Sequence, residues 1–252
     1  MGRPTTEEIQ ERQDFMQVIA ECAESPSKFS EIFLGHKLFD YNIKYVDCQD
    51  RFIVYRSGRQ VGKTMSTAVK AIHFAFFAPL MLKTVKRECT IVIAAPTQNQ
   101  AGIMFDRIRS LIVNNKFLKG YVVRNTQTEM WVNFLDNTGM SKIVTRATGE
   151  HGTTLRGYSP HCIIADECSF IKTDILRAFL PSGMATGARV WLTSTPFSKP
   201  GYFYEACQNS KLKNPDGLWT EFHVKSTDNP LVREDPTFLE EIKRLTREEY
   251  VQ

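Results

Sequence analysis

The residues whose types and spacing suggest chemistry most directly form one run: Ser57, Gly58, Arg59, Gln60, Val61, Gly62, Lys63 and Thr64. The run follows the G-x-x-x-x-G-K-[ST] pattern of phosphate-binding loops, except that Ser57 stands where the first glycine is usual. Gly62 lets the backbone approach phosphates, and the loop N–H groups with the start of the next helix cradle an anion. Lys63 supplies a charge for the β- and γ-phosphates of ATP, and the Thr64 hydroxyl is a ligand for Mg²⁺. The alternative, a chance Gly-Lys-Thr in a loop, is disfavoured by the apolar run before it and the helical pattern after it.

A pair of acids, Asp166 and Glu167, follows the apolar run at residues 161–165. A buried strand that ends in adjacent acids is the Walker B arrangement, and side chains alternate along a strand, so we expect the carboxylates to point different ways. We predict that Asp166 holds the Mg²⁺ shell and that Glu167 faces the γ-phosphate as general base for the attacking water. The alternative is two acids that cap the next helix. The phosphate loop upstream favours the first interpretation, and the two acids together favour a hydrolase over a simple nucleotide binder.

A hydroxyl-rich turn, Thr193, Ser194 and Thr195 followed by Pro196, ends the next apolar run. Such a turn can hydrogen-bond a γ-phosphate or its water and so report hydrolysis to neighbouring elements. Alone it is ordinary turn chemistry. Its place in the strand after the paired acids favours the coupling role.

Two arginines are candidates for charge stabilisation. Arg59 lies inside the phosphate loop and could reach the γ-phosphate of its own subunit; the alternative is a solvent-facing loop charge. Arg156 lies in a loop bracketed by Gly152 and Gly157, before the strand with the paired acids. It could be donated to a neighbouring subunit as an arginine finger. Sequence alone favours an ordinary surface or DNA-facing arginine at that position.

Tyr41 and Asn42 lie about ten residues before the first apolar run. An aromatic ring next to an amide can stack on adenine and hydrogen-bond it. Packing against the first helix is the alternative, and the residues do not decide between them.

Apolar and helical patterns alternate along the rest of the chain, which predicts an α/β, three-layer P-loop fold of the RecA-like type. We expect a mostly parallel central sheet and an N-terminal helical appendage over residues 1–35, opened by a capping box at Thr5 and Glu8. A second helix should be capped by Ser25, with Pro26 as its first residue. The core should span residues 36–228, and residues 229–252 should be a helical segment. The expected strands are 51–56, 89–95, 161–165 and 190–193, the helices 63–77 and 98–113, and the arms of a hairpin 130–135 and 142–146.

The composition and charge of the chain limit the classes of protein to which it can belong. The chain is 42% apolar, which is ample for a packed core, and its formal net charge is +4. Eight basic residues against two acids lie between Lys83 and Arg124, which fits either a polyanion track or a solvated helix face. The candidate DNA contacts are Arg107, Arg109, Lys116, Lys119, Arg124 and Arg146.

Six cysteines without a C-x-x-C pair predict free thiols in a reducing compartment. The polar start and the short apolar run at residues 71–82 predict a soluble intracellular protein.

Together these motifs resemble the ATPase domain of large terminase subunits of tailed phages and herpesvirus-type viruses. The similarity covers roughly residues 35–250. Arginine followed by glutamine inside the phosphate loop is a habit of that family, and so is the Ala-Pro-Thr segment after the next strand. The residues that carry it are the run 57–64, Ala95, Pro96, Thr97, Gln98, Gln100 and Ala101, the run 164–167, and the run 193–196.

The resemblance implies ATP hydrolysis with Mg²⁺ that drives double-stranded DNA into a viral procapsid. Arg59 then acts within its own subunit and Arg156 across subunits. Tyr41 and Asn42 correspond to the adenine-contacting segment, although the family usually has Gln where Asn42 stands. Implied partners are DNA, a homo-oligomeric ring of five subunits on the portal, and the small terminase subunit, all in the host cell cytoplasm and away from membranes. Because the family continues into a nuclease domain with an acidic metal cluster, which this sequence lacks, we expect a fragment without nuclease activity.

Two other functions stay open. A helicase-like DNA translocase would need a second RecA-like domain, for which 252 residues leave no room. A nucleotide-dependent DNA-binding or assembly module without efficient turnover is disfavoured by Glu167.

Overall fold

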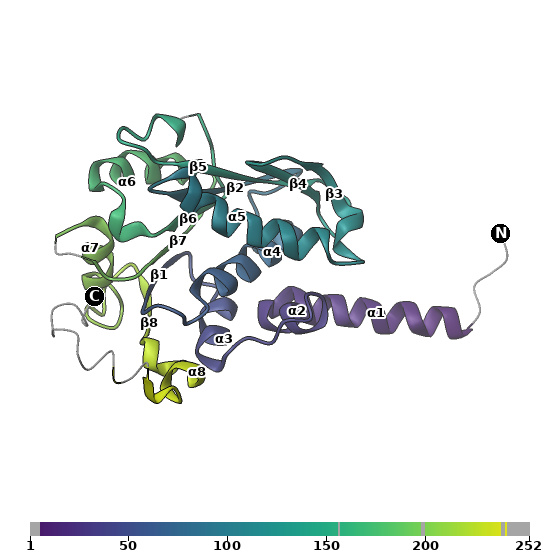
Figure 1. Cartoon of the computed structure of the whole chain (residues 1–252). Helices are drawn as coiled ribbons and strands as arrows, with labels where there is room; N and C mark the ends of the chain where they lie inside the picture. The colour runs from purple at the N-terminus through teal and green to yellow at the C-terminus, as the bar shows by residue number, and fades with distance from the viewer. Residues whose placement is uncertain (1–5, 156, 198–199, 238–239, 241–252) are drawn as a thin grey trace.

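An eight-stranded sheet organises the part of the chain that the computed structural model describes, residues 6–155, 157–197, 200–237 and 240. The strand order is β3-β4-β5-β2-β6-β7-β1-β8 (Figure 1). Strands β5, β2, β6, β7, β1 and β8 run parallel, and β3 and β4 add an antiparallel edge. The strands are β1 Phe52–Ser57, β2 Glu88–Ala95, β3 Val122–Asn125, β4 Glu129–Asn133, β5 Met140–Ala147, β6 Cys162–Asp166, β7 Arg189–Ser194 and β8 Thr220–Val224.

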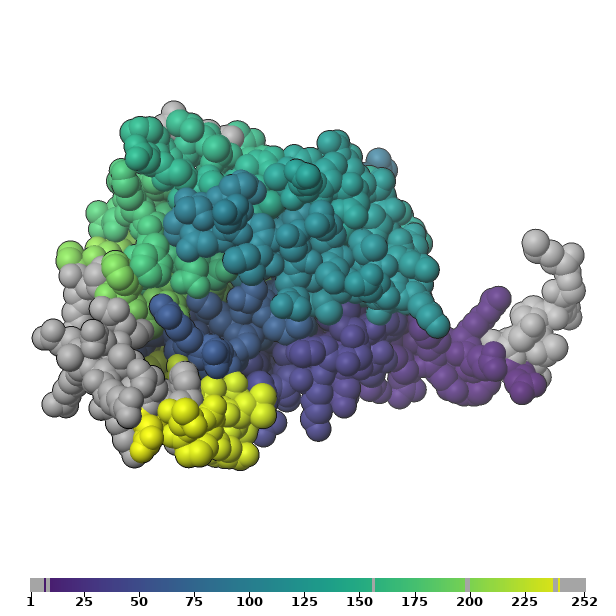
Figure 2. Space-filling model, in the orientation of Figure 1, coloured from purple at the N-terminus to yellow at the C-terminus, as the bar shows by residue number. Residues whose placement is uncertain are grey.

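Helices cover both faces of this sheet, which gives the three layers that the sequence predicts. Helices α1 to α5 pack on one face and α6 and α7 on the other. The helices are α1 Thr6–Glu24, α2 Pro26–Ile32, α3 Asp40–Asp47, α4 Lys63–Met81, α5 Gln98–Val113, α6 Thr173–Phe179, α7 Tyr202–Gln208 and α8 Pro230–Arg233. Helix α1 extends beyond the rest of the molecule, as the purple segment in Figure 2 shows. None of the described helices is long and apolar enough to cross a membrane.

The central strands are buried on both faces, so their sequences are continuously apolar. In β6, Ile164 faces the core of α4 and α5, whereas Ile163 faces the core of α6 and α7. In β7, Trp191 and Val190 divide in the same way. Residues at the carboxyl ends of these strands therefore meet along one edge of a rigid sheet.

The predicted helices before residue 114 and the hairpin are confirmed, with two extensions. Ser25 caps α2 through the Lys28 N–H, as predicted. Helix α1 continues to Glu24, and α4 continues to Met81 through Pro79. Pro79 has no N–H for the carbonyl four residues earlier. The hydroxyl of Ser141 donates to that Ala75 carbonyl at 2.6 Å, which explains how the helix tolerates the proline.

Five of the described helices and strands are absent from the sequence-based prediction: the helices α3, α6 and α7 and the edge strands β3 and β8. Strand β8 carries Glu221, whose side chain is 1% exposed. This carboxylate is paired with Arg56 at 2.8 Å and with Lys213 at 3.2 Å, and it accepts a hydrogen bond from Ser210. Burial of an acid in a strand is tolerated because all three partners neutralise or hydrogen-bond it. Thr5 and most of the predicted helical segment over 229–252, namely residues 238, 239 and 241–252, lie outside the described residues.

Candidate nucleotide-binding site

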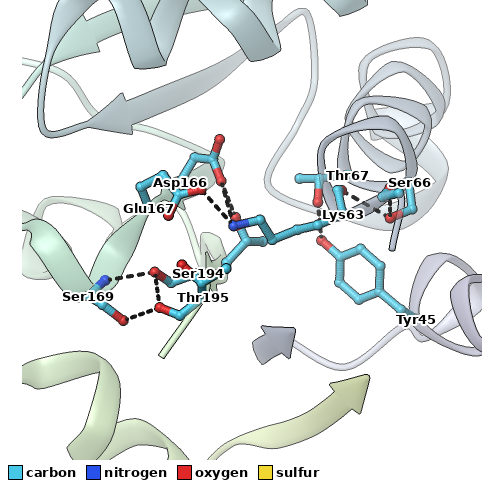
Figure 3. Close-up of polar contacts among 11 residues, drawn as sticks. Tyr45, Lys63, Ser66, Thr67, Asp166, Glu167, Ser169, Ser194 and Thr195 are labelled. Atoms are coloured by element: carbon cyan, nitrogen blue, oxygen red, sulfur yellow. Dashed lines mark hydrogen bonds and ion pairs between the residues drawn. The ribbon is translucent and has the colours of Figure 1, made fainter. Parts of the chain in front are cut away.

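The phosphate loop joins the end of β1 to the start of α4, at the carboxyl edge of the parallel strands. Strand β7 lies between β1 and β6, the strand that ends in the paired acids. Asp166 pairs in register with Thr193, and Ser194 with Arg56. The loop, the acids and the hydroxyl-rich turn are therefore neighbours in space although they are far apart in sequence (Figure 3).

The backbone of the phosphate loop alternates between right-handed and left-handed conformations. Gln60 has φ 61° and Gly62 has φ 78°, both left-handed, and Gly62 directly precedes the first residue of α4. Alternating right- and left-handed residues turn successive N–H groups to one side and form an anion-binding concavity. Ser57 still belongs to β1 and is 1% exposed. Replacement of the usual glycine is accommodated because this position is extended strand, not part of the turn.

Lys63 lies between the two acids. Its Nζ is 2.8 Å from Glu167 Oε1 and 4.0 Å from Asp166 Oδ1 (Figure 3). The side chains of Lys63 and Asp166 are 9% and 7% exposed, and that of Glu167 is 26% exposed. Burial raises the pKa of Asp166, and the positive charge of Lys63 opposes that rise. A lysine and two carboxylates at such distances can hold a phosphate, a metal and a water molecule.

Strand alternation predicted that the two acids point in different directions, but the structure shows both carboxylates near Lys63. Asp166 is the last residue of β6, whereas Glu167 has left the strand with φ 49°. This left-handed residue turns the chain into the following 3-10 helix, so alternation no longer applies, and both carboxylates reach Lys63.

Hydrogen bonds join the end of β6 and the residues that follow it to the hydroxyl-rich turn at the end of β7. Thr193 Oγ1 donates to Asp166 Oδ1 at 2.6 Å. The backbone N–H of Ser169 donates to Ser194 Oγ at 3.1 Å, and the Ser169 hydroxyl donates to the Thr195 carbonyl at 2.9 Å (Figure 3). Sequence reasoning singled out the turn but missed Ser169, because no pattern marks a single serine two residues after the acids.

Asn42 makes a different contact from the predicted one with adenine. It is 2% exposed, its Nδ2 donates to the Val61 carbonyl at 2.8 Å, and its Oδ1 accepts from the Tyr55 hydroxyl at 2.5 Å. Both polar groups of the amide are thus occupied, one by the phosphate loop and the other by strand β1. Tyr41 stacks on Phe39 with ring centroids 5.3 Å apart, and a contact between Tyr41 and adenine stays a prediction.

The two candidate arginines differ in what the structure describes. Arg59 is exposed on the loop, and within the described residues its guanidinium forms no hydrogen bond or ion pair. Arg156 lies outside the described residues. The residues on either side of it, Leu155 and Gly157, are placed, and Thr154 anchors that loop by donating to the Ala147 carbonyl.

The predicted DNA contacts divide into paired and unpaired residues. Arg109 pairs with Asp106 at 2.7 Å, and Glu129 pairs with Arg146 at 2.8 Å and with Arg124 at 3.9 Å. In the described part of the chain, the remaining members form no ion pair and are exposed: Arg107, Lys116 and Lys119. The exposed members lie on α5 and in the segment that follows it.

A phosphate loop after β1, acids after β6 and an additional strand between them define a P-loop ATPase fold of the ASCE class. Within that class, a family model described as terminase large subunit, T4likevirus-type, N-terminal, matches residues 54–252. The chain therefore belongs to the large terminase subunit family. A comparison with curated proteins gave no significant match.

Solved structures show the same fold. The ATPase domain of the Thermus phage P74-26 large terminase is 21% identical, with a TM-score of 0.75 over 90% of this chain and 96% of that one. The bacteriophage HK97 large terminase is 17% identical, with a TM-score of 0.64 over 80% of this chain and 43% of that one. The large terminase of a thermophilic bacteriophage in complex with ADP is 12% identical, with a TM-score of 0.62 over 84% of this chain and 51% of that one.

Proposed function

We propose that residues 36–228 form a Mg²⁺-dependent ATPase that powers translocation of double-stranded DNA into a viral procapsid. The observation that carries the proposal is the contact of Lys63 with two acids, 2.8 Å from Glu167 and 4.0 Å from Asp166. The lysine belongs to a loop built for phosphates, and the acids belong to the strand end that would face the γ-phosphate. The family membership of the chain supports DNA packaging as the work that hydrolysis drives.

The donor set suits Mg²⁺, which prefers hard oxygen ligands. We propose that Thr64, the second residue of α4, and Asp166 hold the ion, which would neutralise charge on the β- and γ-phosphate oxygens. Thr193 donates to one carboxylate oxygen of Asp166 at 2.6 Å. That bond favours the charged carboxylate, which a metal ligand must be, against the burial that raises its pKa.

Glu167 is proposed as the general base. The γ-phosphate of ATP and the Glu167 carboxylate compete for the same Lys63 ammonium, because both are anions next to one donor. When the lysine binds phosphate, Glu167 becomes free to accept a proton from water. The oxygen of that water bonds to the γ-phosphorus while the bond to the ADP oxygen breaks. A side chain that is 26% exposed can reach water from this position.

The remaining roles follow from placement and family resemblance. Arg59, exposed beside the loop, would neutralise γ-phosphate charge in its own subunit, and Arg156 would do so in a neighbouring subunit. Thr193, Ser194 and Thr195 would couple phosphate loss to the rest of the domain. Their hydrogen bonds to the loop after β6 give that coupling a physical route.

We further propose a homo-oligomeric ring, with five subunits on the portal and the small terminase subunit as partner, in the host cytoplasm. Exposed basic residues on and after α5 are the better candidates for DNA phosphates: Arg107, Lys116 and Lys119. Arg109, Arg124 and Arg146 are weaker candidates, because acids already hold them. Such contacts would be independent of DNA sequence and sensitive to salt.

Steady-state ATP hydrolysis by wild type and Glu167→Ala, with Mg²⁺ and DNA, tests the proposal. We expect the substitution to lower kcat by at least about 100-fold, the scale of a general base contribution, with ATP binding retained. Glu88→Ala is the matched control, because Glu88 begins β2 and its side chain is 62% exposed. High protein concentration is required, since Arg156 would come from a neighbour. Equal, near-zero rates for all three proteins would contradict the ATPase proposal.

A further inference from the structure

The segment after β8 contacts the phosphate loop along its outer side. Gly58 donates its N–H to the Val224 carbonyl at 2.8 Å. A Cβ on Gly58 would lie 2.3 Å from Ser226 Oγ and 2.5 Å from Ser226 N, so only glycine fits there. The close approach means that residues 224–229 form one wall of the loop.

Asn229 is the residue of this wall that bonds to the turn of the loop. Its Nδ2 donates to the Gln60 carbonyl at 2.6 Å, and the side chain is almost completely buried, with the residue 6% exposed. From the other side, Asn42 donates to the next carbonyl, that of Val61, at 2.8 Å. Asn42, which precedes the phosphate loop in the sequence, and Asn229, which follows it, thus hold two consecutive carbonyls of the loop through buried amides.

These carbonyl contacts fix where the loop N–H groups point. In a trans peptide the C=O and the following N–H point in opposite directions in one plane. With the Gln60 carbonyl held by Asn229, the Val61 N–H must point the other way, and the Val61 carbonyl fixes the Gly62 N–H likewise. Each N–H group is thus directed away from the asparagine that holds the carbonyl of the same peptide, and is free for an anion.

We propose that Asn229 is a positioning residue for the nucleotide phosphates, acting through the Gln60 carbonyl, in partnership with Asn42. This inference rests on the proposed ATP binding. Without the amide donor, the peptide between Gln60 and Val61 is held less firmly, and this part of the loop must be ordered each time that phosphate binds. The cost falls on nucleotide affinity, because saturating nucleotide restores the same bound loop.

Asn229 has a second bond that allows a clean test. Its Oδ1 accepts from the Leu231 N–H at 3.0 Å and so caps α8. Asn229→Asp and Asn229→Ser both keep a capping oxygen. Both lose the donor to the Gln60 carbonyl, because an ionised carboxylate has no hydrogen to donate at neutral pH and a serine side chain is too short. The serine variant is neutral, which separates loss of the donor from added negative charge near the phosphates.

The experiment measures Kd for ATP and ADP with Mg²⁺ by titration calorimetry, kcat and KM for hydrolysis, and thermal unfolding, on the full chain. We expect ATP binding to weaken about 3- to 10-fold in both variants, the equivalent of one hydrogen bond. We expect kcat to change less than about twofold and the unfolding temperature to stay near that of wild type, which a purely structural cap would not produce. If the folded serine variant keeps wild-type affinity for ATP, the inference about Asn229 is wrong, while the proposed ATPase function still stands. Failure of the wild type itself to bind ATP would overturn the proposed function.

Discussion

Helix α4 carries two buried lysines, Lys63 in its first turn and Lys70 two turns later, with 8% and 2% exposure. Lys63 contacts two carboxylates. Lys70 donates instead to the backbone carbonyls of Val46 at 2.7 Å and Cys48 at 2.5 Å. The same side chain on one helix thus has partners of two kinds.

The partners decide what each lysine can do. Carboxylates at the sheet edge are side chains that can release Lys63 to a phosphate. The carbonyls at the end of α3 are fixed backbone, and the rings of Tyr45 and Trp191 also lie against Lys70, 5.6 and 5.1 Å from Nζ. Burial lowers the pKa of Lys70 to about 7. The contacts of Lys63 therefore allow it to exchange a carboxylate for a phosphate, whereas those of Lys70 hold α4 against the end of α3.

The largest effect should come from Lys63→Ala. We expect ATP hydrolysis to fall by at least about 100-fold, since the charge that stabilises the transferred phosphoryl group is lost. Unfolding free energy should change far less than hydrolysis does. The Glu167 carboxylate left behind is 26% exposed and can take water, and the buried Asp166 carboxylate keeps its hydrogen bond from Thr193. Hydrolysis assays and urea unfolding measure both quantities. Retained hydrolysis would remove the distinction between the two lysines.

Lys70→Met should have the opposite profile. Methionine fills the same volume but leaves the Val46 and Cys48 carbonyls without their donor. We expect the free energy of unfolding to fall by about 2 kcal/mol, the cost of buried acceptors without partners, while ATP affinity is retained. Lys44→Met on the exposed side of α3 is the control in the same urea titration. A more stable Lys70→Met protein would show that the buried charge costs more than its bonds return.

The effect that is smallest at neutral pH should be at His73, one turn further along α4, because it appears only as the pH falls. Its Nε2 bonds to the Cys22 carbonyl at 2.8 Å, and burial lowers the pKa of His73 from 6.5 to about 4. Between these values the unfolded chain binds the proton more tightly, so stability present above pH 6.5 is lost as pH falls towards 4. From pH 7 to 5 the loss should be about 2 kcal/mol. His73→Gln cannot titrate, so the pH slope of its unfolding free energy should be shallower, and equal slopes would refute the assignment.

The sequence predicted the chemistry at the Lys63 end because the phosphate loop is local. Spacing within residues 57–64, and apolar runs ending at Asp166 and Thr193, report strand, turn and helix without any knowledge of distant contacts. The parallel sheet followed from those runs, because doubly buried strands are apolar throughout. The family model and the shared fold confirm the family and the mostly parallel α/β sheet, whereas the roles of the individual site residues stay predictions.

What the sequence could not provide depends on contacts between distant segments. For Asn42 the sequence left an adenine contact and packing as alternatives, and only the structure shows that Tyr55 and Val61 take both ends of its amide. Asn229 was noted only as part of the segment that ends the core, although it holds the Gln60 carbonyl. Strand β8 was missed because its buried Glu221 hides the apolar pattern, and only the partners of that acid explain it.

The position of β1 in the sheet has a consequence for biosynthesis. Its neighbours are β7 and β8, with Phe52 opposite Val190 and Ile53 opposite Thr220. The phosphate loop therefore leaves the ribosome long before the strands that support it. Long-range pairing of this kind is slow to form. A nascent chain should thus gain most of its affinity for ATP only after β7 and β8 have emerged, so we expect ATP not to act as a template for the early stages of folding.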